Sequence, residues 1–337
     1  MLRIHFTPAD LARVRINDSA DPLWEILLSL HLLQAATGSQ TFGHWRKTAR
    51  AELDASAGLL TMLAPPHGYS ADFLTPPSDG QTLLGGIERL CGTAKPVLHR
   101  DLSRLAVERR LPSWAGELAR GEATMMHRLG AALRQYHQVA LAPYWPAVTA
   151  TVRLDRQSRG ETLLGGGLDA LFSTLHSSVR WRAPVLEVDY PVEQDLHLGG
   201  RGLRLIPSFF CWGHAITLED PEQPPVLVYP VTRVDNWAWS LRDRPAGSAS
   251  LGTLLGRTRA QLLDTIATTP SLTTTELAKL LHISLAGASQ HASVLRNAGL
   301  ITTERRAGAA YHRLSAGGSA LLDTSLAQPR LAPRQPR

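Results

Sequence analysis

In the last quarter of the chain, apolar residues recur with the period of an α-helix. Leu277, Leu280 and Leu281 recur at spacings of three and four, which predicts a helix that buries all three leucines. Thr273 and Glu276 precede this stripe as a capping box, in which the hydroxyl caps the third helical residue and the carboxylate reaches back to the cap. We therefore expect a helix that begins next to Thr273.

A second short helix is predicted after a tight turn. Ser284 has the chemistry of an N-cap, and Gly299 followed by Leu300 is typical of a helix that ends in a left-handed turn with a hydrophobic contact. These two signals predict a helix over roughly 285–298. The residues expected to face the core are Leu285, Ala288, Ala292 and Leu295.

The segment after this helix has the pattern of a β-hairpin. Residues 301–306 and 309–314 are predicted strands, with a turn at Ala307-Gly308 between them. An amphipathic helix is expected before the pair of helices, on the apolar residues Leu254, Leu255, Leu262, Leu263 and Ile266. Another helix is expected over 316–326. This order of elements predicts a winged helix-turn-helix.

The second predicted helix carries small and polar side chains on the face opposite its apolar stripe, and a short helix of this kind fits the major groove of DNA. Gln290 can read adenine through two hydrogen bonds, and Ser289 can contact a base or a phosphate. For His291, a phosphate and a base are equally suitable partners. The arginines of the hairpin are expected near phosphates or in the minor groove, although each can also be an ordinary solvated surface group. The predicted DNA-binding residues are Ser284, Ala286, Gly287, Ser289, Gln290, His291, Ser293, Arg296, Arg305, Arg306, His312 and Arg313.

The motif S-x-x-x-x-S-x-H followed by V-L-R-x-A-G-L-I, at residues 284–301, resembles the recognition-helix signature of the ArsR family of bacterial transcriptional regulators. The run 255–263 also resembles the first helix of that family, and the resemblance covers residues 251–324. The chain departs from the family pattern at Gly287, where a hydroxylated or larger residue is usual, and at Ala292, where leucine is usual. The family's familiar sensor cysteines are absent from residues 276–282. The resemblance implies a repressor that occludes a promoter and leaves it when an effector binds.

The charge balance separates the same region from the rest of the chain. Residues 251–337 hold ten Lys or Arg against four Asp or Glu, whereas the whole chain holds 35 against 29, so both balances are +6. The first 250 residues are therefore neutral. A general preference for arginine is an alternative explanation of the high pI, but it does not explain why the excess lies where a DNA-binding surface is predicted.

The first 240 residues change character along their length. The segments 22–34, 42–54, 80–91, 99–110, 121–142 and 160–177 read as helices, and 2–6, 185–190, 202–207 and 225–230 as short strands. The fold class is thus predicted as α+β: a mostly helical N-terminal domain with a small sheet, followed by a C-terminal winged helix-turn-helix. The predicted domains are 1–241, a linker at 242–250, the winged helix at 251–326 and a disordered tail at 327–337.

The opening run 2–16 and the run 72–77 resemble the large N-terminal domain that precedes this type of winged helix in some actinobacterial regulators. By analogy of fold alone, such a domain is a sensor or a dimerisation platform. All eight tryptophans lie in this part of the chain. The best candidate for an apolar ligand site consists of Phe209, Phe210, Trp212, Trp237 and Trp239, with an ordinary hydrophobic core as the alternative.

The sequence shows no motif for several other kinds of functional site. The thirteen histidines show no metal-ligand spacing, and Cys91 and Cys211 are too few for a disulfide framework or a zinc motif, so no metal site is predicted. The glycine runs at 85–86 and 165–167 lack the spacing of a phosphate loop, and we expect breaks or close packing there. No catalytic residue and no cofactor are predicted. Without a signal peptide or a long apolar run, we expect a cytoplasmic protein with no membrane partner.

Together these observations predict a DNA-binding transcriptional regulator that is not an enzyme. Its expected partners are double-stranded DNA, a second copy of the chain and a small-molecule effector bound in the N-terminal domain. Two alternatives stay open. The N-terminal domain can be enzyme-like with a DNA-binding appendage, or the winged helix can serve protein–protein assembly.

Overall fold

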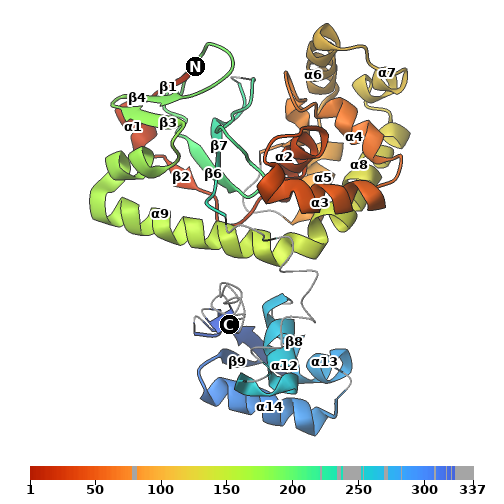
Figure 1. Ribbon diagram of the computed structural model, residues 1–337, viewed down its shortest axis with the longest axis vertical. Helices are drawn as coiled ribbons and strands as arrows, with labels where there is room; N and C mark the ends of the chain where they lie inside the picture. Colours follow the sequence, from red (N-terminus) through yellow and green to blue (C-terminus); the bar gives the residue numbers. More distant parts are fainter. Residues whose placement is uncertain are drawn as a thin grey trace, which may run out of the picture. The chain divides into compact units, whose positions relative to one another are not determined.

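The chain divides into two compact units, residues 1–239 and 240–337, which are described separately below. The structure, a computed structural model, describes residues 1–77, 82–220, 222–233, 237, 252, 254–268, 272–281, 283–306, 309–315, 317–319 and 321–322. The predicted linker 242–250 and the predicted tail 327–337 lie outside the described residues. The predicted fold class is confirmed, because helices predominate and small sheets complete both units (Figure 1).

The first unit is mainly helical. Its α-helices are α1 (Pro8–Leu11), α2 (Pro22–Gln34), α3 (Ser39–Glu52), α4 (Ala57–Leu63), α5 (Leu83–Cys91), α6 (Lys95–Glu108), α7 (Trp114–Ala119), α8 (Ala123–Tyr136) and α9 (Trp145–Thr174). Three short helical turns add to them: η1 (Asp72–Leu74), η2 (His137–Leu141) and η3 (Ala142–Tyr144). The short helices α4 and α7 were not predicted, and α9 begins at Trp145 instead of near residue 160.

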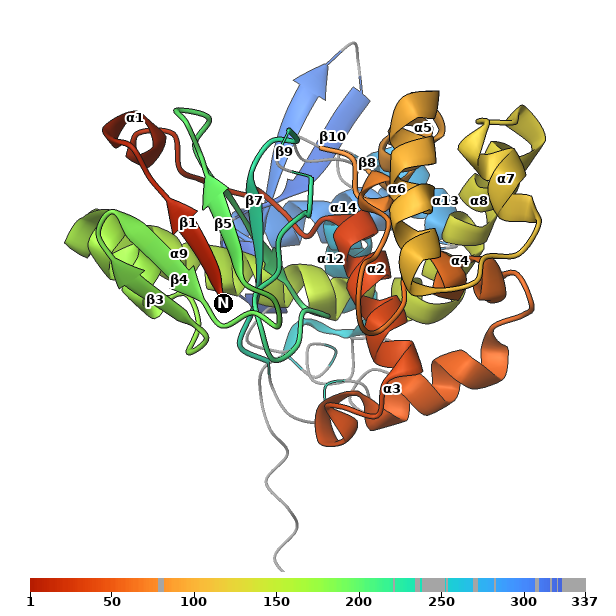
Figure 2. The same ribbon diagram turned by 90° about the horizontal axis from the view of Figure 1, so that it is seen from above.

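Two small sheets lie beside one another within the first unit. One has the strand order β3-β4-β1-β5, and the other has the order β2-β6-β7. Their strands are β1 (Leu2–His5), β2 (Arg15–Ile16), β3 (Val179–Arg182), β4 (Val185–Val188), β5 (Gln194–His197), β6 (Arg204–Ser208) and β7 (Val226–Pro230). β1 is antiparallel to β4 and parallel to β5. The strands occupy one side of the unit and helices α2 to α8 the other, while α9 runs along both (Figure 2).

On the sheet side of the unit, successive side chains of β1 alternate between the core and the surface. Leu2 and Ile4 are fully buried, whereas Arg3 and His5 between them are partly exposed. Leu2 and Ile4 share one cluster with Phe172 of α9. This strand therefore connects both ends of the unit's sequence in a single core.

A buried glutamate joins the helical side to the end of β6. Glu25 of α2 is fully buried, and its carboxylate accepts the backbone N–H groups of Phe209 and Phe210 at 2.7 and 2.9 Å and the hydroxyl of Ser208 at 3.0 Å. Burial raises the pKa of Glu25 to about 7, although the three hydrogen bonds and the charge of Arg233 act in the opposite direction. Glu25 thus accepts hydrogen bonds from backbone N–H groups just after β6, where the chain leaves the sheet.

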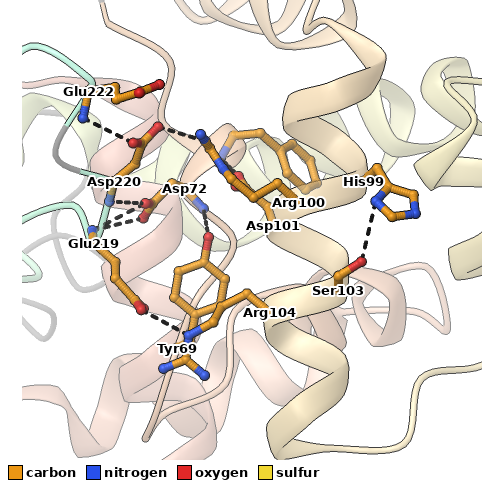
Figure 3. A network of polar contacts seen from close by, with 11 residues as sticks. Tyr69, Asp72, His99, Arg100, Asp101, Ser103, Arg104, Glu219, Asp220 and Glu222 are labelled. Atoms are coloured by element: carbon orange, nitrogen blue, oxygen red, sulfur yellow. Dashed lines mark hydrogen bonds and ion pairs between the residues drawn. The ribbon is translucent and has the colours of Figure 1, made fainter.

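A second polar network fixes the segment around η1 to α6 and to residues 219–220 (Figure 3). Asp72 accepts the N–H groups of Glu219 and Asp220 at 3.1 and 2.9 Å, and Asp101 of α6 accepts the N–H of Phe73 at 2.8 Å. Arg100 completes the network through an ion pair of 2.6 Å with Asp220. Burial raises the pKa of Asp72 to about 7, and the neighbouring charge of Asp101 adds to this effect.

The longest helix, α9, consists of a straight part and a short end. Gly167 has a φ of 68°, which interrupts the helical backbone, so the predicted break in the run of three glycines is confirmed. On the straight part, Val148 and Val152 are fully buried. Asp155 on the same side accepts a hydrogen bond of 2.6 Å from the hydroxyl of Tyr229. The straight part of α9 therefore packs on the unit along one face.

The second unit contains three labelled helices and one three-stranded sheet. Its elements are α12 (Arg257–Thr268), β8 (Leu272–Thr273), α13 (Thr274–Leu280), α14 (Leu285–Asn297), β9 (Ile301–Arg306) and β10 (Ala309–Leu314). The sheet has the order β8-β10-β9. Leu262, Leu263 and Ile266 of α12 pack with α13, α14 and β9 in one core, whereas Leu254 is 69% exposed and does not join it. Residues 317–319 and 321–322 are helical, as predicted for this segment.

Candidate nucleic-acid interface

The helix-turn-helix begins with the predicted capping box at Thr273. The backbone N–H of Thr273 donates to the carboxylate of Glu276 at 2.7 Å, and the N–H of Glu276 donates to the hydroxyl of Thr273 at 3.3 Å. These bonds hold the pKa of Glu276 below its usual value. The prediction is therefore confirmed in both of its hydrogen bonds.

Both predicted ends of α14 are present. The hydroxyl of Ser284 accepts the N–H of Gly287 at 3.0 Å, so this predicted DNA-binding residue also caps the helix. Gly299 has a φ of 72°, and the N–H of Leu300 donates to the carbonyl of Leu295 at 2.9 Å. This is the left-handed helix end that the sequence predicts.

The side of α14 that packs on the unit is narrower than predicted. Ala288, Ala292 and Leu295 are buried, but Leu285 is 55% exposed. Leu280, at the end of α13, is also 55% exposed, while Leu277 is fully buried. The predictions that place Leu280 and Leu285 in the core are wrong, because both leucines flank the turn between the helices and lie beyond the residues that form the core.

Small and polar residues form the opposite side of α14, which we call the outward stripe: Ala286, Gln290, Ser293 and Asn297. Ser293 is half-buried and the other three are exposed. Their spacings of four, three and four place them along one line of the helix, opposite Ala288 and Ala292. Asn297 was missed from the sequence, because its place just before Gly299 reads as part of the helix end. Ser289 is exposed at the edge of this stripe.

His291 and Gly287 lie away from the centre of the outward stripe. The ring of His291 is half-buried, and its Nδ1 is buried without a hydrogen-bond partner among the described residues. Gly287 is half-buried, and a Cβ atom there would lie 3.1 Å from the hydroxyl of Ser284. Glycine at 287 therefore leaves room for the capping hydroxyl.

The hairpin of β9 and β10 places its arginines on opposite faces. Arg305 stands opposite Ala310, and Arg313 stands opposite Thr302. Because successive side chains of a strand alternate, Arg305 shares the face of Ile301, while Arg313 lies on the other face. Both arginines are exposed. The side chain of Arg306 lies outside the described residues.

His312 is a structural residue and not a DNA contact. Its side chain is 3% exposed, and both ring nitrogens are engaged, Nε2 with the hydroxyl of Thr274 at 2.9 Å and Nδ1 with that of Thr303 at 3.0 Å. Burial, together with the charge of Arg296, lowers the pKa of His312. The prediction that His312 contacts DNA is therefore wrong, since a neutral buried ring connects α13 to both strands of the hairpin.

Positive charge is exposed at several points of the second unit. Arg296 is exposed in the last turn of α14, and Lys279 is exposed on α13. With Arg305 and Arg313 of the hairpin, they surround the helix-turn-helix with side chains that can bind phosphate. Glu276 and Glu304 are the exposed acidic residues of the described part of this unit.

The aromatic residues predicted as a ligand site in the first unit do come together. The ring of Trp237 lies 4.7 Å from that of Phe209, which in turn lies 5.3 Å from Phe210. These three side chains are at most 6% exposed. Trp212 is 40% exposed, and Trp239 lies outside the described residues. The close contacts of the buried rings favour the alternative of an ordinary core.

A cation covers this aromatic cluster. The guanidinium of Arg233 lies 5.3 to 5.6 Å from the ring centres of Phe42, Phe209 and Trp212. It also donates to the backbone carbonyls of Phe209 and Cys211. Burial lowers the pKa of Arg233. Arg233 and Glu25 therefore bind the same turn after β6, one through its carbonyls and the other through its N–H groups.

The described part of the chain contains neither a metal-binding cluster nor a membrane-spanning helix. No three His, Cys, Asp or Glu side chains there are arranged to hold a metal ion. None of the helices described combines the length and the apolar character that crossing a bilayer requires.

Comparisons with known proteins concern the second unit. Residues 255–310, which lie within this unit, match the MarR family. Among solved structures, reduced HlyU from Vibrio cholerae N16961 is similar at 27% identity, over 23% of this chain and 84% of that chain, with a TM-score of 0.20. A search of curated proteins gives no match.

Proposed function

We propose that the chain is a sequence-specific transcriptional regulator that binds DNA through α14. The observation that carries this proposal is the outward stripe, in which small and polar side chains stand opposite the core within a unit that matches the MarR family over residues 255–310. A helix with small outward side chains can approach base edges closely. Gln290 lies in the middle of the stripe, where its amide can pair with adenine.

Within this proposal the exposed cations position the domain on the duplex. Arg296 and Arg313 bind phosphates, and Arg305 near the end of the hairpin binds phosphate or the minor groove. Ser284, Ala286, Gly287, Ser289, His291 and Ser293 stay predicted contacts of the recognition helix. Leu285 joins them, because an exposed leucine in the first turn of α14 can contact the methyl group of thymine.

The finer assignment is a dimeric repressor of the ArsR type, released by a small molecule. The ArsR resemblance of residues 284–301 favours this mode of action. Two copies would read half-sites about 34 Å apart. The effector must bind the state that cannot bind DNA more tightly, because otherwise it would shift no equilibrium.

A depression on the first unit is a candidate site for an effector. Its volume is about 560 Å³, within the range of ordinary ligand sites. The residues that line it are Ile16, Arg153, Arg156, Gln157, Gly160 and Leu163. Two guanidinium groups beside two aliphatic side chains favour an anion with an apolar part.

The first experiment is binding of the full-length protein to its own upstream DNA and to a scrambled duplex, followed by fluorescence anisotropy across a salt series. We expect a preference of about a thousandfold and a steep salt dependence. Equal weak binding to both duplexes with little salt dependence would contradict the proposal and favour the protein-assembly alternative.

Two variants separate base contacts from phosphate contacts. Gln290→Ala should relax the preference at one base position, whereas Arg305→Ala should weaken binding to all sequences and reduce the salt slope by about one. Equal losses on every sequence for both variants would remove this assignment.

The effector and the repressor role need separate tests. A ligand screen read by thermal shift and tryptophan fluorescence tests the effector, with Arg156→Ala as the variant that should lose the response to an anionic compound. Transcription from the bound promoter, measured with and without the protein, tests repression. Turnover of a screened compound would instead favour an enzyme-like first unit.

A further inference from the structure

The outer face of α9 is exposed over several turns. Leu154 is 52% exposed and Leu164 is 89% exposed, and Gln157 and Glu161 between them are also exposed. These four residues recur at spacings of three, four and three, so they form one line along the straight part of the helix. We call this line the α9 stripe.

The two leucines of the α9 stripe point away from the core of their own unit, whereas Gln157 lies at the rim of the depression that Ile16 also lines. The buried residues of this stretch, Val148 and Val152 together with Asp155 and Arg159, lie on the opposite side of the helix. With 3.6 residues per turn, their mean direction differs from that of the stripe by about 180°. The leucines of the stripe therefore have no neighbours in their own core to cover them.

The order of residues along the stripe is complementary to itself. If two α9 helices pack antiparallel around a two-fold axis beside residue 159, Leu154 meets Leu164 of the second copy. Within one helix the amide of Gln157 donates to the carboxylate of Glu161 at 3.1 Å. In the same register Gln157 also meets Glu161 of the second copy, so its second amide hydrogen faces a carboxylate at both symmetric positions. An isologous interface requires exactly this relation, in which residue i contacts residue j and j contacts i.

The residues beside the stripe allow the helices to approach closely. Ser158 and Gly165 flank it on one edge and Gly160 on the other, and a Cβ atom built on Gly160 or Gly165 would meet nothing within 4 Å. Small residues at these edge positions leave room for the backbone of a second helix. A second copy of α9 would thus match all three features of this surface: the two leucine layers, the amide–carboxylate layer on each side of the axis, and the small residues at the edges.

We propose that the α9 stripe is the interface through which two copies of this chain form a dimer. The inference rests on the proposed dimeric regulator, and it goes beyond it by placing the interface in the first unit and not in the DNA-binding unit. The two DNA-binding units would then be related by a two-fold axis that passes between the two α9 helices.

The first test compares full-length variants by sedimentation velocity over a range of concentrations. Leu164→Glu should raise the dimer Kd about 100-fold or more, because the charge enters both leucine layers. Val107→Glu is the matched control, since Val107 is a 78% exposed residue of another helix, and it should leave the Kd unchanged. A monomeric wild-type protein, or a Leu164→Glu protein that stays as dimeric as the control, would overturn the proposal.

A second test reads the register and does not depend on a destabilising change. Gln157→Glu places like charges opposite each other twice and should raise the Kd about tenfold, and adding Glu161→Gln should restore it by exchanging the two partners. In a Cys91→Ser background, Ser158→Cys should form an intermolecular disulfide on oxidation, whereas Arg156→Cys, which is exposed away from the stripe, should not. The proposed register would be overturned if adding Glu161→Gln did not restore the Kd and if the Arg156→Cys and Ser158→Cys proteins crosslinked equally.

The failure of this inference can be told apart from failure of the proposed function. If Leu164→Glu remains a dimer that binds its own upstream DNA specifically, the interface lies elsewhere and the regulator proposal stands. If Leu164→Glu becomes monomeric while wild-type protein shows no specific binding, the interface stands and the DNA-binding proposal falls.

Discussion

Glu25 in the first unit and His312 in the second are both buried polar residues that hold separate segments together, but they differ in the charge they can carry. Glu25 faces three donors with a carboxylate whose pKa is about 7, whereas His312 joins two threonine hydroxyls as a ring with a lowered pKa. Asp10, Asp72 and Asp101 are further buried carboxylates of the first unit. In the described part of the second unit, His312 is the buried polar residue.

This difference follows from how each unit closes its backbone hydrogen bonds. In the first unit, buried carboxylates accept N–H groups from segments far away in sequence: those just after β6, those of residues 219–220 and that of Phe73 in η1. In the second unit, the capping box, the left-handed helix end and the hairpin ladder are local. This unit therefore needs few polar side chains for backbone hydrogen bonding, and those on α14 can form the outward stripe. Polar substitutions should accordingly affect folding in the first unit and binding in the second.

The largest effect is expected from Glu25→Ala. The change leaves the N–H groups of Phe209 and Phe210 buried without an acceptor, which should lower the free energy of unfolding by about 3 kcal/mol or more. Urea unfolding followed by tryptophan fluorescence reports on the first unit alone, because all eight tryptophans precede residue 251. Glu117→Ala, at an exposed position of α7, is the control and should change stability by less than about 0.5 kcal/mol. Equal midpoints for the two variants would contradict the role of Glu25.

A smaller loss is expected from His312→Ala in the second unit. Two hydrogen bonds disappear and a buried space opens, so the cost should be about 2 kcal/mol. Hydrogen exchange of α13 and β10, measured by mass spectrometry, should become faster, while exchange in the first unit should not change. Arg305→Ala, on the same hairpin but exposed, serves as the control. Unchanged exchange in α13 would show that the ring contributes little to the fold.

The buried carboxyl groups also predict how the stability of the first unit depends on pH. The pKa of both Glu25 and Asp72 is raised to about 7, so the folded state keeps protons that the unfolded state releases near pH 4. Stability should therefore fall as pH rises towards 7, by at most about 1.4 kcal/mol per pH unit for each carboxyl group, and level off by pH 8, where the folded state has released these protons too. Below pH 6.5, His31, whose pKa is lowered to about 4 by burial, acts in the opposite direction.

Tryptophan-detected unfolding at several pH values tests this prediction. Glu25→Gln should reduce the slope between pH 6.5 and 8, because one of the two carboxyl groups no longer titrates. A wild-type slope that is zero, or that has the opposite sign, would contradict the raised pKa values.

The smallest effect on folding is expected from Asn297→Ala. Asn297 is exposed at the end of the outward stripe, so the free energy of unfolding should change by less than about 0.5 kcal/mol. Its effect should appear in binding, as a loss of preference at one base pair or a uniform loss through phosphate. Anisotropy with single-base variants of the bound duplex distinguishes the two. No change in binding to any duplex would restrict the interface to the first three turns of α14.

Local signals in the sequence were sufficient for most of the second unit. The cap at Thr273, the cap at Ser284, the turn at Gly299 and the two hairpin strands each depend on neighbours within a few residues, and the structure has all of them. The errors at Leu280, Leu285 and His312 concern burial. A helical period shows which side of a helix is apolar, but it does not show how far along the helix the core extends.

The first unit was less predictable because its contacts join distant segments. β1 lies between β4 and β5, and its partners are at least 180 positions away from it in the sequence. The strands β3 and β5 are short, and Arg180, Arg182 and Asp195 within them hide their alternation. The start of α9 was missed because Gly160 and the nearby prolines read as boundaries, although Pro146 stands in the first turn, where proline is tolerated.

The central position of β1 also sets an order of events in time. A ribosome makes this strand well before its two neighbours, because the antiparallel neighbour begins at Val185 and the parallel neighbour at Gln194. At ordinary rates of translation β1 waits roughly 10 to 40 s for its partners. During that wait Leu2 and Ile4 have no sheet to enter, so the nascent chain depends on chaperones or on early helices to keep them from other exposed strands. The second unit, which follows the first and is held by local contacts, can fold as soon as it emerges.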